Sequence, residues 1–147
     1  MRLKISSTVT LWVNRVIFLS VLALAILLPW LMDLYIAARP LDSDAQKAIF
    51  LAYYACAPVV LFALWNIEWL VRRILAGDVF IPNNVRRISR LRWCCLLVSL
   101  ICLPAAFFYA PLVFFCIVMA FLCPVVNVVR YVFDAAVTIR EENDLTI

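Results

Sequence analysis

Four long apolar stretches, none containing a charged residue, limit what this chain can fold into more than any other feature of its sequence. They are residues 16–32, 49–65, 93–109 and 110–126. A hydrocarbon core about 30 Å thick is crossed by about 20 helical residues, and each stretch reaches that length with its flanks included. The stretches show no in-and-out alternation, which argues against a membrane barrel. The sequence therefore predicts an all-α, multi-pass membrane protein.

Composition and length agree with one membrane domain. The 147 residues are 68% hydrophobic, whereas apolar residues make up about half of a soluble domain. We predict a single integral membrane domain over residues 1–147, folded as a four-transmembrane-helix bundle. Its spans are expected at about 11–37, 48–71, 90–109 and 111–133. An inner loop is expected at 72–92 and a cytoplasmic tail at 134–147.

The distribution of positive charge predicts the orientation. Of the 13 Lys and Arg residues, only Arg39 and Lys47 fall on one side of the membrane when the four spans are drawn, and six Arg lie between the second and third spans. Short loops rich in Lys and Arg stay in the cytoplasm. Both termini and the 72–92 loop are therefore expected to be cytoplasmic. The localisation that follows is the inner membrane of a bacterial cell, where anionic lipids would also attract the loop.

Capping residues mark the expected helix ends. Asp42 and its polar neighbours can cap the second helix. The only glycine of the chain, Gly77, stands where a left-handed residue would close that helix. Asn83 or Asn84 is expected to cap the third helix.

Enzyme chemistry finds little support in this sequence. There is no His, which removes imidazole bases and most catalytic zinc sites. The six Cys form no Cys-x-x-Cys pair, and the spacings Cys95/Cys102 and Cys116/Cys123 place each pair on one helix face. We expect these thiols to pack between helices, and we expect no enzyme activity, cofactor or metal. A thiol enzyme using Cys94 or Cys95 is the weakest alternative.

Each span contains one proline and no midplane charge. Such prolines kink helices and free a backbone carbonyl, and the kinks are either ordinary features of membrane helices or the walls of a lipid- or drug-accepting cavity. Transporters usually keep an ionisable residue near the midplane, and none is present. The prolines are Pro29, Pro58, Pro104 and Pro124.

Two patches of sequence resemble a known family. Gly77-Asp78-Val79-Phe80 followed by Asn84-Val85-Arg86-Arg87-Ile88 is similar to an inner-loop Gly-x-x-Phe, Asn-x-x-x-(Leu or Ile) motif, and the ending Glu142-Asn143-Asp144-Leu145-Thr146-Ile147 is similar to an acidic Leu-Thr-Ile or Leu-Thr-Val tail. Both occur in a bacterial family of small four-helix integral membrane proteins catalogued as a domain of unknown function. The resemblance implies no established activity, and some members are encoded beside a small helix-turn-helix regulator.

These observations favour a non-enzymatic membrane anchor or sensor that holds a cytoplasmic partner, such as a transcriptional regulator. The residues expected to dock that partner are Gly77, Phe80, Asn84, Arg86, Arg87, Arg90, Asp144, Leu145 and Ile147. The plainer alternative is that they only cap a turn and end a helix. The alternative function is a small oligomeric carrier or lipid-interacting protein. Expected partners are membrane lipids, the regulatory protein and further copies of the chain. Direct nucleic-acid binding is not expected, because an Arg cluster without a recognition fold is weak evidence for it.

Overall fold

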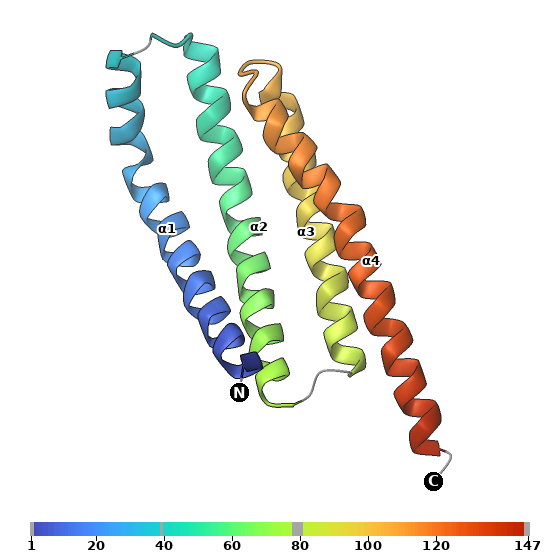
Figure 1. Cartoon of the computed structure of the whole chain (residues 1–147). Coiled ribbons are helices and arrows are strands. Elements are labelled where there is room, and N and C mark those ends of the chain that lie inside the picture. Colours follow the sequence, from blue (N-terminus) through green and yellow to red (C-terminus); the bar gives the residue numbers. More distant parts are fainter. Residues whose placement is uncertain (1, 39, 78–80, 146–147) are drawn as a thin grey trace.

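The protein consists of four long α-helices joined by short connections (Figure 1). A computed structural model describes the backbone of residues 2–38, 40–77 and 81–145, and the side chains of residues 8–38, 40–77 and 81–142. The helices are α1 (Arg2–Ala38), α2 (Ser43–Leu75), α3 (Pro82–Ala106) and α4 (Leu112–Leu145). No strand occurs in these ranges. The predicted all-α fold is confirmed.

All four helices are long and apolar enough to cross a membrane. At about 1.5 Å per residue, even the 25 residues of α3 exceed a hydrocarbon core about 30 Å thick. Large apolar side chains cover the outside of the molecule, and examples such as Ile26 and Phe107 are 80% and 87% exposed. A lipid-facing surface has this composition, because lipid rather than water solvates it.

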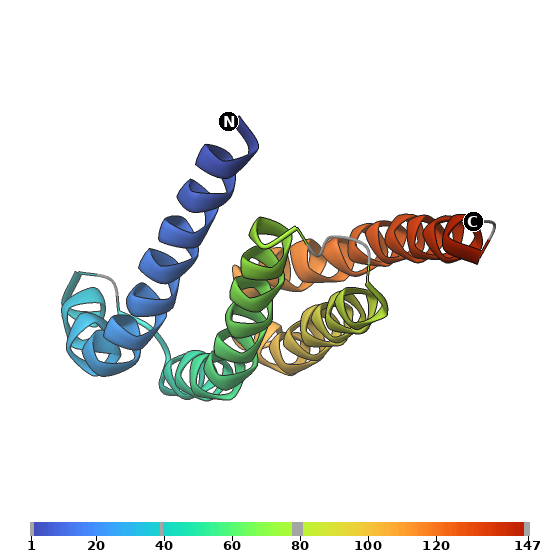
Figure 2. The same ribbon diagram turned by 90° about the horizontal axis from the view of Figure 1, so that it is seen from below.

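The helices lie in sequence order in an open array (Figure 2). Within the described residues, close backbone contacts join α1 to α2, α2 to α3 and α3 to α4, and no other pair of helices. One side-chain contact links α1 to the α3–α4 turn: the Tyr35 hydroxyl of α1 lies 3.4 Å from the Tyr109 hydroxyl in that turn. The four helices therefore form one curved layer, in which the backbone of each helix lies beside that of the next helix in the chain.

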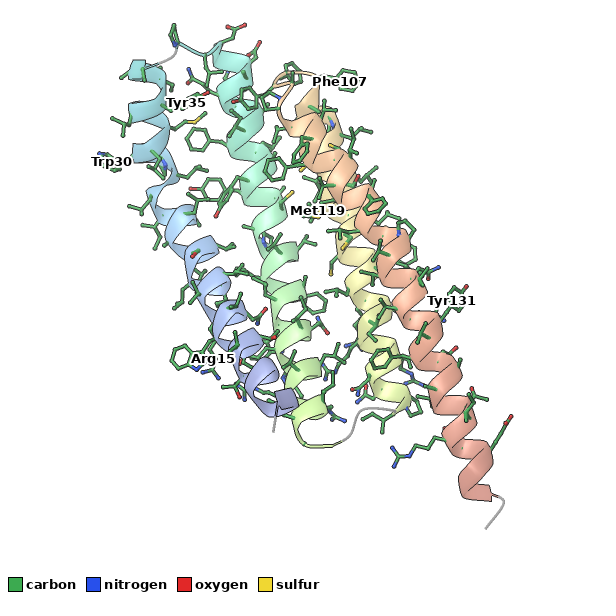
Figure 3. All side chains as sticks on the ribbon, in the orientation of Figure 1. Arg15, Trp30, Tyr35, Phe107, Met119 and Tyr131 are labelled. Atoms are coloured by element: carbon green, nitrogen blue, oxygen red, sulfur yellow. The ribbon has the colours of Figure 1, made fainter. Side chains whose placement is uncertain are left out.

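Both chain termini and the α2–α3 connection lie at one end of the array (Figure 1). We call this the basic end, because Arg15, Arg72, Arg73, Arg86, Arg87 and Arg90 belong to the helical turns that approach it. The opposite end, called the far end, carries the α1–α2 and α3–α4 turns. Figure 3 shows Arg15 toward the basic end and Tyr35 and Phe107 toward the far end. An even number of spans produces this arrangement.

Small residues and thiols form the contacts between α2, α3 and α4. Ala48 and Ala52 of α2 pack on Ala105 of α3, and a second cluster contains Cys102 and Cys116. Small side chains let membrane helices approach closely. The expectation that cysteines pack between helices is confirmed for the second cluster, where the Cys56 sulfur of α2 lies 3.7 Å from the Cys102 sulfur of α3. All six cysteines are free thiols.

Two tyrosines join α1 to α2 within the apolar region. Pro29 has no N–H, so the Ala25 carbonyl four residues earlier loses its helical donor. The Tyr54 hydroxyl of α2 donates to that carbonyl at 2.8 Å. The adjacent Tyr53 hydroxyl donates to the Val21 carbonyl at 2.6 Å. The proline of α1 is therefore accommodated by a side chain of the next helix, which fixes how the two helices pack.

The observed helix ends agree with the predicted ones at both ends of α2 and differ at the start of α3. Asp42 caps α2, and its carboxylate accepts from the Ser43 N–H at 3.0 Å. Gly77 follows the end of α2 with a φ of 93°, as predicted. The prediction that Asn83 or Asn84 caps the third helix is wrong. Ile81 is the N-cap, because Pro82 has the fixed φ that suits the first helical position.

A candidate functional site at the basic end

A buried asparagine and an ion-pair cluster hold α1 against α2 at the basic end. The Asn14 side chain is 5% exposed and donates to the Leu64 carbonyl at 3.2 Å. One turn further along α2, Glu68 Oε1 accepts from Arg72 at 2.6 Å and from Arg15 at 3.4 Å. Glu68 therefore neutralises one arginine from each helix. These two arginines have a structural task that leaves them less available to a partner.

The Trp69 ring contacts two further arginines, one from α2 and one from α3. The Arg73 guanidinium lies 5.7 Å from the centroid of the Trp69 ring, and the Arg87 guanidinium lies 5.0 Å from it. Such contacts are electrostatically attractive and contribute about 0.5–1 kcal/mol each at exposed sites. The Nε atoms of Arg73 and Arg87 are buried and have no hydrogen-bond partner in the described structure. This cluster of Trp69, Arg73 and Arg87 is called the Trp69 cluster.

Asn84 anchors the beginning of α3 from the inside. It is 0% exposed, the lowest value among the described residues. Its backbone N–H donates to the Ile81 carbonyl at 3.0 Å, within the first turn of the helix. Its burial means that an approaching partner would meet the surrounding surface first. Asn84 is thus positioned to support the α2–α3 connection, and its role in docking stays a prediction.

A polar contact also joins α3 to α4 near the basic end. Arg92 donates to the Asn127 side-chain carbonyl at 2.7 Å, and its guanidinium lies 5.5 Å from the Trp93 ring centroid. A pocket of about 370 Å³ opens beside this pair, next to Pro124. Each pair of consecutive helices is therefore joined at this end by a contact that involves an arginine side chain. These contacts are made by arginine, glutamate and asparagine side chains and by the Trp69 ring, where the apolar region gives way to polar surroundings.

The structure separates the predicted docking residues by their environment. Gly77 follows the end of α2 and is exposed. Arg86 is exposed on the first turns of α3, and Arg87 belongs to the Trp69 cluster. Arg90 is exposed and lies beside a groove between α2 and α3. Asp144 and Leu145 lie in the last turn of α4, and their side chains are outside the described part. Phe80 and Ile147 lie outside the described residues altogether.

Sequence reasoning did not single out Trp69 or Arg73 for a role at this site. Their spacing of four residues carried a signal, because an aromatic and a cation so placed lie on the same face of a helix. The contribution of Arg87 from the next helix had no such local signal. Within the described residues, no group of three or more potential ligands is placed to hold a metal ion. The described side chains can make electrostatic and apolar contacts with charged or amphipathic molecules.

Four helices of membrane-spanning length, with apolar surfaces and with charged residues gathered near their ends, define a multi-pass all-α membrane protein. The chain belongs to the family described as "Protein of unknown function (DUF2975)", whose model matches residues 40–147. The predicted membership of a family of unknown function is confirmed. The match covers α2, α3 and α4 and includes both sequence patches. Comparisons with curated proteins and with solved structures gave no match.

Proposed function

We propose that this protein is a non-enzymatic membrane anchor or sensor that holds a cytoplasmic protein at its basic end. One observation carries the proposal: both termini and the α2–α3 connection lie at the same end, and α4 continues there beyond the other helices (Figure 1). The far end has only short turns. A partner that binds by polar contacts has more surface to meet at the basic end than at the far end.

The charges at the basic end support a protein partner. Arg86 is exposed and makes no ion pair or ring contact in the described structure. On the projecting end of α4, Arg140, Glu141 and Glu142 are all exposed. A surface that presents both signs on two helices favours a partner with a complementary mixed pattern. The positive-inside bias would put this surface in the cytoplasm of a bacterial cell.

A regulatory protein is the partner class that we propose. The family resemblance implies that some members are encoded beside a small helix-turn-helix regulator. In this function the membrane protein would hold or release the regulator, and the regulator would supply any contact with DNA. The chain itself would act by binding alone.

The test is a crosslinking pull-down from native membranes. We would compare the intact chain, Arg86→Ala, a chain truncated after Glu142 and the far-end control Lys47→Ala, at matched levels of membrane insertion. Recovery of the same soluble regulatory protein with the intact chain and the control, and its loss with Arg86→Ala or the truncation, is the expected result. Equal recovery with all four chains would contradict the proposal.

A second candidate function, an oligomeric carrier of an amphipathic molecule, is favoured by one observation. A groove of about 700 Å³ opens between α2 and α3 at the far end, where Leu51, Ala52 and Pro104 lie beside the Asp44–Lys47 ion pair. An apolar groove with a charged rim suits an amphiphile. Saturable flux of such a molecule into liposomes that contain the purified chain would favour this candidate over the anchor.

A further inference from the structure

A second groove between α2 and α3 lies toward the basic end and carries a cation among apolar residues. Its volume is about 510 Å³. Val59 and Phe62 line it from α2, and Arg90, Cys94 and Leu97 line it from α3. Arg90 is the only charged residue of the lining and stands nearest the α2–α3 connection in sequence. We call this the Arg90 groove.

Helix periodicity places the Trp69 cluster in line with the Arg90 groove. On α2, Trp69 lies seven residues after Phe62, which is two turns along the same face, and Arg73 follows one turn later. On α3, Arg87 lies three residues before Arg90 and thus on the adjoining turn. The facing surfaces of α2 and α3 are therefore apolar at membrane depth. They become cationic over about 10 Å toward the basic end.

The cations on this surface are not neutralised within the described structure. The carboxylate of Glu68, which directly precedes Trp69 in the sequence, is engaged by Arg15 and Arg72. Arg73, Arg87 and Arg90 take part in none of the ion pairs among the described residues. In addition, the buried Nε atoms of Arg73 and Arg87 have no hydrogen-bond partner there.

We propose that the Arg90 groove and the Trp69 cluster together bind one anionic phospholipid of the cytoplasmic leaflet. An acyl chain lies in the groove against Phe62 and Leu97, and the phosphate receives hydrogen bonds from Arg87 and Arg90. Guanidinium groups match the geometry of phosphate oxygens and bind them strongly. Trp69 lies at headgroup depth, where tryptophan is common in membrane proteins. The site selects lipid by headgroup charge and requires an attached chain.

The lipid site and the proposed protein-docking surface use different residues, so neither depends on the other. The protein partner is assigned to Arg86 and the projecting end of α4, whereas the lipid is assigned to Arg87, Arg90 and the groove. Loss of lipid binding would leave partner capture by Arg86 intact. Loss of partner capture would leave the lipid site intact.

The experiment is native mass spectrometry of the purified full chain in detergent. Dioleoyl phosphatidylglycerol is compared with dioleoyl phosphatidylcholine, which has the same chains and no net charge. We expect one phosphatidylglycerol to be retained, with an affinity that falls about fivefold in Arg87→Gln and in Arg90→Gln, because each variant loses a charged hydrogen bond to the phosphate. The matched control Arg86→Gln, on the same helix, should keep the affinity. Equal retention of the two lipids, or an equal loss in Arg86→Gln, would overturn the proposal.

A second variant tests the groove without changing any charge. Leu97→Trp fills the groove and should lower retention of phosphatidylglycerol, whereas Leu96→Trp, which lies on the side of α3 that faces α4, should not. Inorganic phosphate is the probe for the headgroup alone and should fail to displace the lipid. Displacement by phosphate, or full retention in Leu97→Trp, would contradict a lipid site with a chain-binding groove. A folded Leu97→Trp chain keeps the test valid even where Arg87→Gln fails to fold.

Discussion

The Tyr54 hydroxyl donates a 2.8 Å hydrogen bond to the Ala25 carbonyl, the same carbonyl that Pro29 leaves without its helical donor. A side chain of α2 thus supplies the hydrogen-bond donor that the proline removes from α1. Within a membrane an unsatisfied carbonyl is costly, because no water is present to replace the missing donor. The α1–α2 pairing is therefore specified by a polar contact in an otherwise apolar region.

Tyr54→Phe is expected to destabilise the folded protein by about 1 kcal/mol, since the Ala25 carbonyl loses its donor. In a Pro29→Ala background the effect should be smaller, because residue 29 then supplies an N–H to the same carbonyl. Unfolding in mixed detergent micelles measures both values. An equal effect of Tyr54→Phe in the two backgrounds would show that the proline and the tyrosine are not coupled.

Glu68→Gln should weaken the α1–α2 contact at the basic end by about 0.2–1 kcal/mol, because Arg15 and Arg72 lose their shared carboxylate. The double variant Arg15→Glu with Glu68→Arg restores opposite charges and should recover part of the loss. The same unfolding measurement, made at low and high salt, checks this. A loss that does not shrink in high salt would argue against an ion-pair origin.

Trp69→Leu is expected to loosen the start of α3, because the Arg73 and Arg87 guanidiniums both lose an aromatic partner. Each contact contributes about 0.5–1 kcal/mol. Trypsin cleavage near the α2–α3 connection, measured in proteoliposomes, should become several times faster. Trp65→Leu, on the same helix and also exposed, is the matched control and should leave the cleavage rate unchanged.

Cys56 and Cys102 should form an intrachain crosslink when native membranes are treated with a mild membrane-permeant oxidant, because their sulfurs are 3.7 Å apart. The thiols are oxidised to a disulfide and the added oxidant is reduced. Peptide mapping by mass spectrometry identifies the linked pair. Cys102→Ser should abolish that pair, and a crosslink from Cys56 to Cys123 instead would contradict the order of the helices.

The sequence was sufficient for those parts of the fold that depend on local or one-dimensional signals. Span number and helix type follow from hydropathy, and the end of α2 follows from the single glycine at position 77. The start of α3 was predicted less well, because Pro82 determines the first turn and moves Asn84 to an interior position. Asparagines are frequent caps, but here the fixed φ of proline decides which residue is the cap.

The candidate site could be predicted from the sequence less well than the fold, because it depends on how neighbouring helices pack. Arg86, Arg87 and Arg90 are four residues or fewer apart in sequence, yet one is exposed, one packs on Trp69 and one lies beside a groove. That division requires the relative rotation and register of α2 and α3. Periodicity within one helix carries neither quantity. The contact of Arg92 with Asn127 has the same origin, because 35 residues separate the two.

The sequential contacts of the helices bear on how the chain reaches its folded state. Because close backbone contacts among the described residues join only helices that follow one another in the chain, a new span leaving the ribosome can meet a backbone neighbour as soon as it has entered the bilayer. A contact that skips a helix, such as the one between the Tyr35 and Tyr109 hydroxyls, can form only after the α3–α4 turn has been made. Contacts between consecutive helices are short in sequence and favour rapid assembly. The backbone contacts can therefore form in the order in which the helices are synthesised.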